Sequence, residues 1–124
     1  MNPTVSILTP TYDERVDFLK FVAKGICQQT YKNILEWVIV DGTRKGVSIL
    51  PEALDEIRTY KNIPKIVYVP QDTTRKNSIG NVRNIAKATA AGAIMIHFDD
   101  DDYYPESRIE HAVTQLNNTK RQIA

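Results

Sequence analysis

The stretch AIMIHFDDDD, residues 93–102, joins an apolar run directly to four consecutive aspartates. The run 93–98 predicts a fully buried strand, because a strand covered on both faces of a parallel sheet is apolar throughout. Adjacent carboxylates repel one another, and burying them is costly unless a cation or hydrogen-bond donors lie nearby. We therefore expect this strand to end beside something that carries positive charge.

Strands and helices alternate along the rest of the chain. Apolar and β-branched runs predict further strands at residues 4–8, 35–40 and 65–69. Apolar residues spaced three or four apart predict helices at residues 13–29, from 51 onward, at 78–91 and after Pro105. Such alternation implies right-handed βαβ units. The predicted fold class is therefore α/β, an open and mostly parallel sheet of about four strands with helices on both faces.

Single residues mark the expected ends of these elements. Pro10 cannot donate to a strand ladder, so the first strand is expected to stop at Thr9-Pro10-Thr11. Asp13 can cap the first helix with its carboxylate, and Gly92 is placed to end the third.

Size and composition narrow the class of protein. A chain of 124 residues, with 42% hydrophobic and 25% charged residues, predicts one folded domain over residues 1–124. The net charge of +1 disfavours a nucleic-acid partner. The single cysteine, Cys27, cannot form an internal disulfide, no apolar run is long enough to span a bilayer, and the N-terminus lacks a basic leader. A cytoplasmic location is expected.

Polar residues follow three of the predicted strands. They are Thr9–Tyr12, Asp41 and the aspartates 99–102. Ligands of parallel sheets bind outside the carboxyl ends of the strands. Hard cations such as Mg²⁺ or Mn²⁺ take oxygen ligands, and phosphates often complete their coordination shell. A divalent cation with a phosphate-bearing ligand is therefore expected here, and a solvated acidic turn is the alternative. The spacing excludes an EF-hand loop.

Four motifs together resemble family 2 glycosyltransferases with the GT-A fold, which is Rossmann-like in this half. They are VSILTPTYDE at 5–14, EWVIVDG at 36–42, GNVRN at 80–84 and IHFDDDDYYP at 96–105. Each motif is short, but all four in this order across about 100 residues form a specific resemblance. It covers essentially the whole chain.

The resemblance implies a binding site for a nucleotide-sugar donor, a UDP-sugar above all. The segment that would wrap the base and ribose consists of Thr9, Pro10, Thr11 and Tyr12. Asp41 would accept a hydrogen bond from the uracil ring imide, although many members carry two acidic residues at this point. Arg83 would contact the nucleotide or steady the aspartates, because its guanidinium fork suits either.

The aspartates match the D-x-D motif of the family, which binds the ribose and, through Mn²⁺ or Mg²⁺, the diphosphate. The preferred register assigns Asp99 and Asp100 to the nucleotide and Asp99 and Asp101 to the metal. Counting back from Pro105 instead favours Asp100 with Asp101 or Asp102. The nearby rings of Trp37 and Tyr104 are interpreted as packing residues, with stacking on a sugar or base as the alternative.

The implied reaction is inverting transfer of the sugar to a hydroxyl of an acceptor that the sequence does not identify. Family members place the catalytic base and the acceptor-binding part well after the D-x-D motif. The 124 residues are therefore expected to form the donor-binding part, with no catalytic residue assigned. The alternative is a metal-dependent nucleotide-binding module without turnover. A receiver domain is disfavoured, because Thr9-Pro10-Thr11 and Pro70 stand where its acidic residues would be.

Overall fold

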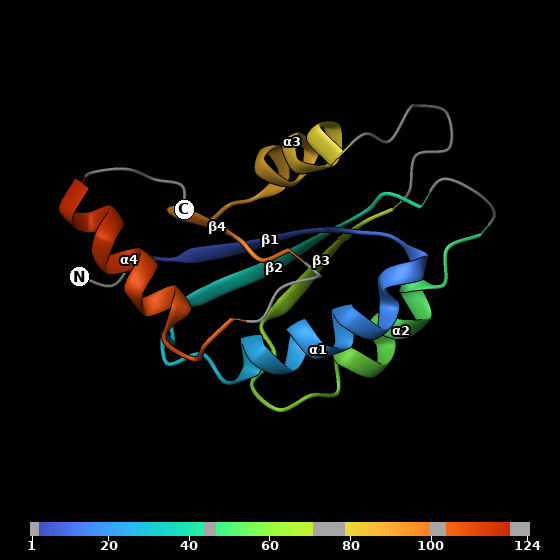
Figure 1. The fold of residues 1–124 in the computed structure, drawn as a ribbon, viewed down its shortest axis with the longest axis horizontal. Helices are drawn as coiled ribbons and strands as arrows, with labels where there is room; N and C mark the ends of the chain where they lie inside the picture. The colour runs from blue at the N-terminus through green and yellow to red at the C-terminus, as the bar shows by residue number, and fades with distance from the viewer. Residues whose placement is uncertain (1–2, 44–46, 71–78, 100–103, 120–124) are drawn as a thin grey trace.

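Four strands form one parallel sheet in a computed structural model that describes residues 3–43, 47–70, 79–99 and 104–119 (Figure 1). The strands are β1 (Val5–Thr11), β2 (Ile34–Asp41), β3 (Lys65–Val69) and β4 (Ile94–His97). They lie in the order β3-β2-β1-β4, and every neighbouring pair runs parallel. The predicted α/β class and the parallel sheet are confirmed.

Helices cover both faces of this sheet. They are α1 (Val16–Cys27), α2 (Leu50–Ile57), α3 (Ile79–Thr89) and α4 (Arg108–Thr119). Figure 1 shows α1 and α2 on one face, α3 on the other, and α4 beside the end where β1 begins. Within the described residues, none of these helices combines the length and the apolar character that a bilayer crossing requires.

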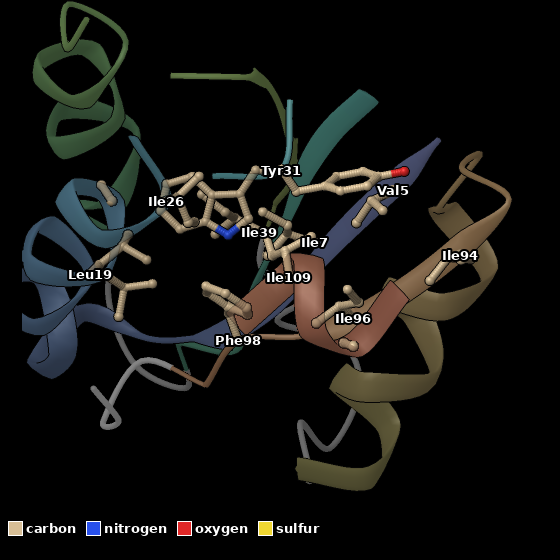
Figure 2. Close-up of a cluster of buried hydrophobic side chains, with 14 of the residues drawn as sticks. Val5, Ile7, Leu19, Ile26, Tyr31, Ile39, Ile94, Ile96, Phe98 and Ile109 are labelled. Atoms are coloured by element: carbon tan, nitrogen blue, oxygen red, sulfur yellow. The ribbon is translucent and has the colours of Figure 1, made fainter. Parts of the chain in front are cut away.

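The core consists of two layers, because successive strand residues point to opposite faces. Val5 and Ile7 face the larger layer, which also contains Leu19 of α1 and Ile109 of α4 (Figure 2). Leu8 faces the smaller layer, where it packs with Val38, Val40 and Ala86 under α3. Both faces of the central strands are therefore buried, which explains their unbroken apolar runs.

The first strand runs three residues beyond its predicted end at residue 8, through Thr9, Pro10 and Thr11. Pro10 pairs with Val40 and Thr11 with Asp41. The expected stop at Pro10 is wrong, because only the β4 side of the strand loses a donor. Leu8 accepts from Phe98 on the β4 side, and backbone groups alternate in direction along a strand, so residue 10 also faces β4. The β2 ladder is left intact.

The first helix begins later than its sequence indicates. A single 3-10 turn, Asp13–Arg15, follows β1, and α1 starts only at Val16. Arg15 occupies the N-cap position and makes no side-chain capping bond. The helix therefore starts three residues after Asp13, and the side chain of Asp13, the expected cap, lies outside the described part of the structure.

Gly92 is required by a close approach to β1 rather than by the end of α3, which stops at Thr89. A Cβ at this position would lie 2.6 Å from Ser6 Oγ and 2.7 Å from Ser6 N. The Gly92 amide donates to Ser6 Oγ (2.8 Å), and that hydroxyl donates to Glu36 Oε2 (2.5 Å). The same carboxylate oxygen accepts from Ala91 N (2.6 Å). These bonds tie the α3–β4 turn to the sheet.

Candidate functional site

The carboxyl ends of β1, β2 and β4 bring most of the predicted site residues to one edge of the sheet. Thr11 and Asp41 are direct neighbours in the β1–β2 register. Leu8 pairs with His97, so Asp99 follows just beyond the end of β4. The strand order reverses direction between β1 and β4. Such a switch point is where open α/β sheets form their binding crevice.

Thr9 lies in a buried relay of hydrogen bonds beneath this edge. The Trp37 indole Nε1 donates to Thr9 Oγ1 (2.8 Å), and Thr9 Oγ1 donates to the Phe98 carbonyl (2.6 Å). All three residues are at most 1% exposed. Trp37 is thus a packing residue, as interpreted, and the Thr9 side chain faces the protein interior.

Pro10 ends the β1–β4 ladder while the β1–β2 ladder continues. The Phe98 amide donates to the Leu8 carbonyl (2.9 Å). In a parallel ladder the next bond would run from the amide of residue 10 to the Phe98 carbonyl. Proline has no amide hydrogen, and the Thr9 hydroxyl satisfies this carbonyl instead. The backbone hydrogen bonds between the two strands therefore end at Phe98.

Asp41 presents a buried carboxylate at the end of β2. It is 2% exposed, and its Oδ1 accepts from the Thr43 amide (2.9 Å). Its Oδ2 accepts from the Tyr68 hydroxyl (2.6 Å), which comes from β3. Each carboxylate oxygen has a further lone pair, so Asp41 can still accept a hydrogen bond from a ligand. Tyr68 was not foreseen, because its reach to Asp41 depends on strand register.

Asp99 and Tyr104, the described residues on either side of positions 100–103, are joined by a hydrogen bond. The Asp99 amide donates to the Tyr104 hydroxyl (2.8 Å). The Tyr104 ring stacks on Phe98, with centroids 4.0 Å apart and an interplanar angle of 14°. Tyr104 therefore packs, as interpreted from the sequence. The predicted ligands Asp100 and Asp101 lie outside the described residues.

The chain after this segment is anchored at the C-terminal end of α1. Gln29 is 2% exposed, and its amide nitrogen donates to the Pro105 carbonyl (2.8 Å). Its side-chain oxygen accepts from the Ile109 amide (3.0 Å) at the start of α4. The Thr30 amide donates to the Glu106 carbonyl (2.8 Å). Nothing in the sequence marks Gln29, which looks like an ordinary polar residue at a helix end.

Tyr12 is the exposed member of the predicted base-wrapping segment, at 37% exposure. The Arg15 guanidinium lies 5.7 Å from the Tyr12 ring centroid and 5.6 Å from that of Phe18. Arg15 Nε also donates to the Tyr12 hydroxyl (3.1 Å). Arg83 lies in α3, and its side chain is outside the described part of the structure.

The donor chemistry at the end of β4 suits a hard divalent cation. Asp99 is half-buried there, and the sequence continues with Asp100, Asp101 and Asp102. Carboxylate oxygens are the ligands that Mg²⁺ and Mn²⁺ prefer. Among residues 3–43, 47–70, 79–99 and 104–119, no three acidic, histidine or cysteine side chains gather closely enough to hold a metal. A metal site here would depend on the aspartates after Asp99.

Comparisons with known proteins place the chain among glycosyltransferases. The model of glycosyl transferase family 2 matches residues 6–124. The crystal structure of S. aureus TarS 1–349 superposes with a TM-score of 0.67 at 20% identity, covering 93% of this chain and 32% of TarS 1–349.

The same S. aureus fragment in complex with UDP-GlcNAc gives a TM-score of 0.69 at 21% identity, with 93% and 31% covered. Its complex with UDP gives the same TM-score and identity, with 93% and 32% covered. The chain thus spans about a third of the length of these structures, whose likeness shows a shared fold. The curated proteins include no match.

Proposed function

Because the chain belongs to glycosyl transferase family 2, we propose that it is the donor-binding part of an inverting glycosyltransferase, with a UDP-sugar as donor. The observation that carries the proposal is the placement of two carboxylates at one edge of the sheet. Asp41 ends β2, Asp99 follows β4, and β1 lies between these strands. UDP and UDP-GlcNAc occur in complexes of TarS, which has the same fold.

The base would bind on the Asp41 side of this edge. A carboxylate is an acceptor only, and uracil presents a ring N–H where cytosine presents an acceptor. Tyr68 and Thr43 hold both oxygens of Asp41 in place, so the remaining lone pairs have a fixed direction. Thr11 lies beside Asp41, and the exposed Tyr12 ring follows it. Uracil would therefore be distinguished from cytosine by this one hydrogen bond.

The diphosphate would bind on the Asp99 side. Asp99 and Asp101 would hold Mn²⁺ or Mg²⁺, with Asp99 and Asp100 also reaching the nucleotide. Such an ion, when bound, neutralises charge that develops on the departing diphosphate. Tyr104 fixes the start of this segment through the Asp99 amide and the Phe98 ring. Arg83 would add a positive charge from α3.

Transfer with inversion requires an acceptor hydroxyl and a base that removes its proton. The acceptor oxygen bonds to the anomeric carbon as the bond to the diphosphate breaks, and the base keeps the proton. No residue of the described chain is proposed as that base. A cytosolic location and the absence of a nucleic-acid partner stay predictions.

Calorimetric titration of UDP into the chain, with Mg²⁺ and with EDTA, tests this proposal. We expect binding that strengthens with Mg²⁺, because metal and diphosphate each supply ligands that the other needs. Asp41→Ala should weaken UDP in both solutions. Glu106→Gln is the matched control, because it removes the charge of an exposed carboxylate just before α4. The Thr30 amide bonds to the backbone carbonyl of Glu106, which this substitution leaves in place.

Two results would count against the proposal. Failure of the wild-type chain to bind UDP in either solution removes the donor site. If Asp41→Ala and Glu106→Gln change UDP affinity equally, Asp41 is not part of the donor site. Release of UDP from UDP-GlcNAc, measured with and without candidate acceptors, separates a transferase from a module that binds without turnover.

A further inference from the structure

We propose that Thr9 positions Asp99, through the peptide bond that joins Asp99 to Phe98, and does not contact the ligand. This inference rests on the proposed function, because it concerns the metal-binding side of the same donor site. It assigns to Thr9 a different role from the nucleotide contact that the sequence implies.

The Thr9 hydroxyl is already committed on the protein side. A threonine hydroxyl donates one hydrogen bond, and Thr9 gives its proton to the Phe98 carbonyl at 2.6 Å. It also accepts from the Trp37 indole at 2.8 Å. Because Thr9 has no exposed surface, its side chain cannot reach a ligand without breaking both bonds.

The bond to Phe98 replaces a missing bond of the sheet. The ladder between β1 and β4 would continue from residue 10 to the Phe98 carbonyl, and Pro10 has no amide hydrogen to give. Without Thr9 this carbonyl would be buried and unsatisfied, because Phe98 is only 1% exposed. The Thr9 hydroxyl therefore fixes the peptide unit between Phe98 and Asp99, where the β1–β4 ladder ends.

Other contacts hold the same point from outside. The Tyr104 ring stacks on Phe98, and its hydroxyl accepts the Asp99 amide hydrogen at 2.8 Å. The peptide between Phe98 and Asp99 is thus bound at its carbonyl by Thr9 and at its amide by Tyr104. Both bonds fix the backbone directly before the Asp99 side chain, so losing the Thr9 bond should disturb metal binding first.

Trp37 orients the relay. Its indole N–H can only donate, so the Thr9 oxygen must accept from it and direct its own proton elsewhere. The Phe98 carbonyl is the acceptor that lies within reach. The chain contains a single tryptophan, and its indole signal therefore reports on this relay without interference.

The test compares Thr9→Val with Thr9→Ser by calorimetric titration of UDP in Mg²⁺ and in EDTA. Valine keeps the shape of threonine and removes the hydroxyl, whereas serine keeps the hydroxyl. We expect Thr9→Val to lose about tenfold or more of the UDP affinity in Mg²⁺ and to stay within about twofold in EDTA. Thr9→Ser should restore the affinity in Mg²⁺, which a general packing defect would not allow.

Several outcomes would overturn the positioning role. Equal losses of UDP affinity in Mg²⁺ and in EDTA would make Thr9 a direct ligand contact, and no loss in either would leave it without a role. Absence of UDP binding by the wild-type chain in both solutions would refute the proposed function itself, and the positioning role with it.

A second measurement covers the case in which Thr9→Val does not fold, as near-ultraviolet circular dichroism would show. The indole N–H of Trp37 is then followed by nuclear magnetic resonance in the wild-type chain. Its signal should shift when UDP and Mg²⁺ are added together and stay in place when UDP is added with EDTA. A signal that moves in neither titration, or equally in both, contradicts the relay.

Discussion

Replacing Gly92 by alanine should destabilise the protein strongly, whereas the same change at Gly25 should not. A Cβ on Gly92 would lie 2.6 Å from Ser6 Oγ, 2.7 Å from Ser6 N and 3.0 Å from the Val5 carbonyl carbon. Ser6 and Val5 belong to β1, which is hydrogen-bonded on both sides. The neighbouring backbone therefore cannot move aside, and the turn before β4 must shift instead.

The loss of stability in Gly92→Ala follows from the hydrogen bonds that this shift of the turn would break. The amide of residue 92 donates to Ser6 Oγ at 2.8 Å, and the Ala91 amide donates to the buried Glu36 carboxylate at 2.6 Å. Overpacking costs about 1–3 kcal/mol, and a hydrogen bond to a charged group contributes about 1.5–3 kcal/mol. We expect a loss of about 3 kcal/mol or more. For a domain of this size that lowers Tm by about 10 °C or more.

Gly25 provides the matched control. It lies in α1, and the nearest atom to a Cβ there would be the Tyr104 carbonyl oxygen at 3.9 Å, an ordinary contact. Alanine is favoured over glycine in a helix by about 0.5–1 kcal/mol. Equilibrium unfolding in urea should therefore show opposite signs for the two variants, at unchanged slope. A Gly92→Ala variant within about 0.5 kcal/mol of the wild type would refute this reasoning.

Further predictions concern the site and the surface. Asp41→Asn should lower UDP affinity about tenfold or more, and CDP affinity less, because an amide can donate to the cytosine ring nitrogen; an unchanged ratio in calorimetric titrations contradicts the uracil contact. Asp101→Asn should abolish the gain in UDP affinity that Mg²⁺ provides and leave titrations in EDTA unchanged; equal losses in both exclude a metal ligand. The hydrogen bond from Lys20, and then its charge, lower the pKa of Glu56 from 4.5. The stability that this pair contributes is present above pH 4.5 and is lost as the pH falls through the lowered pKa of Glu56. In urea unfolding between about pH 7 and about pH 3, Lys20→Gln should therefore lose less stability toward acid than the wild type. Parallel stability curves for the two proteins would contradict this prediction.

The order and type of the secondary-structure elements were predictable because apolar spacing reports which faces are buried. The run 93–98 was expected to be a buried strand, and β4 occupies Ile94–His97 within it. The error at Pro10 has a simple cause. A rule about proline treats a strand as one object, whereas β1 has two neighbours and loses a donor toward only one of them.

The edge that carries the site was also predictable, since topology alone brings the carboxyl ends of parallel strands together. The individual contacts were not. Tyr68 meets Asp41 only because it pairs with Ile39 in the β2–β3 register. Trp37 meets Thr9 by the same kind of offset between β1 and β2. Apolar spacing predicts which face a residue occupies but not which residue of the next strand lies beside it.

Among the described strands, β4 pairs with β1 alone, and this affects both folding and local unfolding. Thr9 and Phe98 are 89 positions apart in sequence, so their contact closes a long loop and is expected to form late in folding. Local unfolding that releases β4 would dismantle the junction at Thr9 and Phe98 while β1, β2 and β3 stay paired. A ligand that contacts both Asp41 and Asp99 would hold β4 against β1. Hydrogen exchange at the Phe98 amide would then slow when the ligand binds.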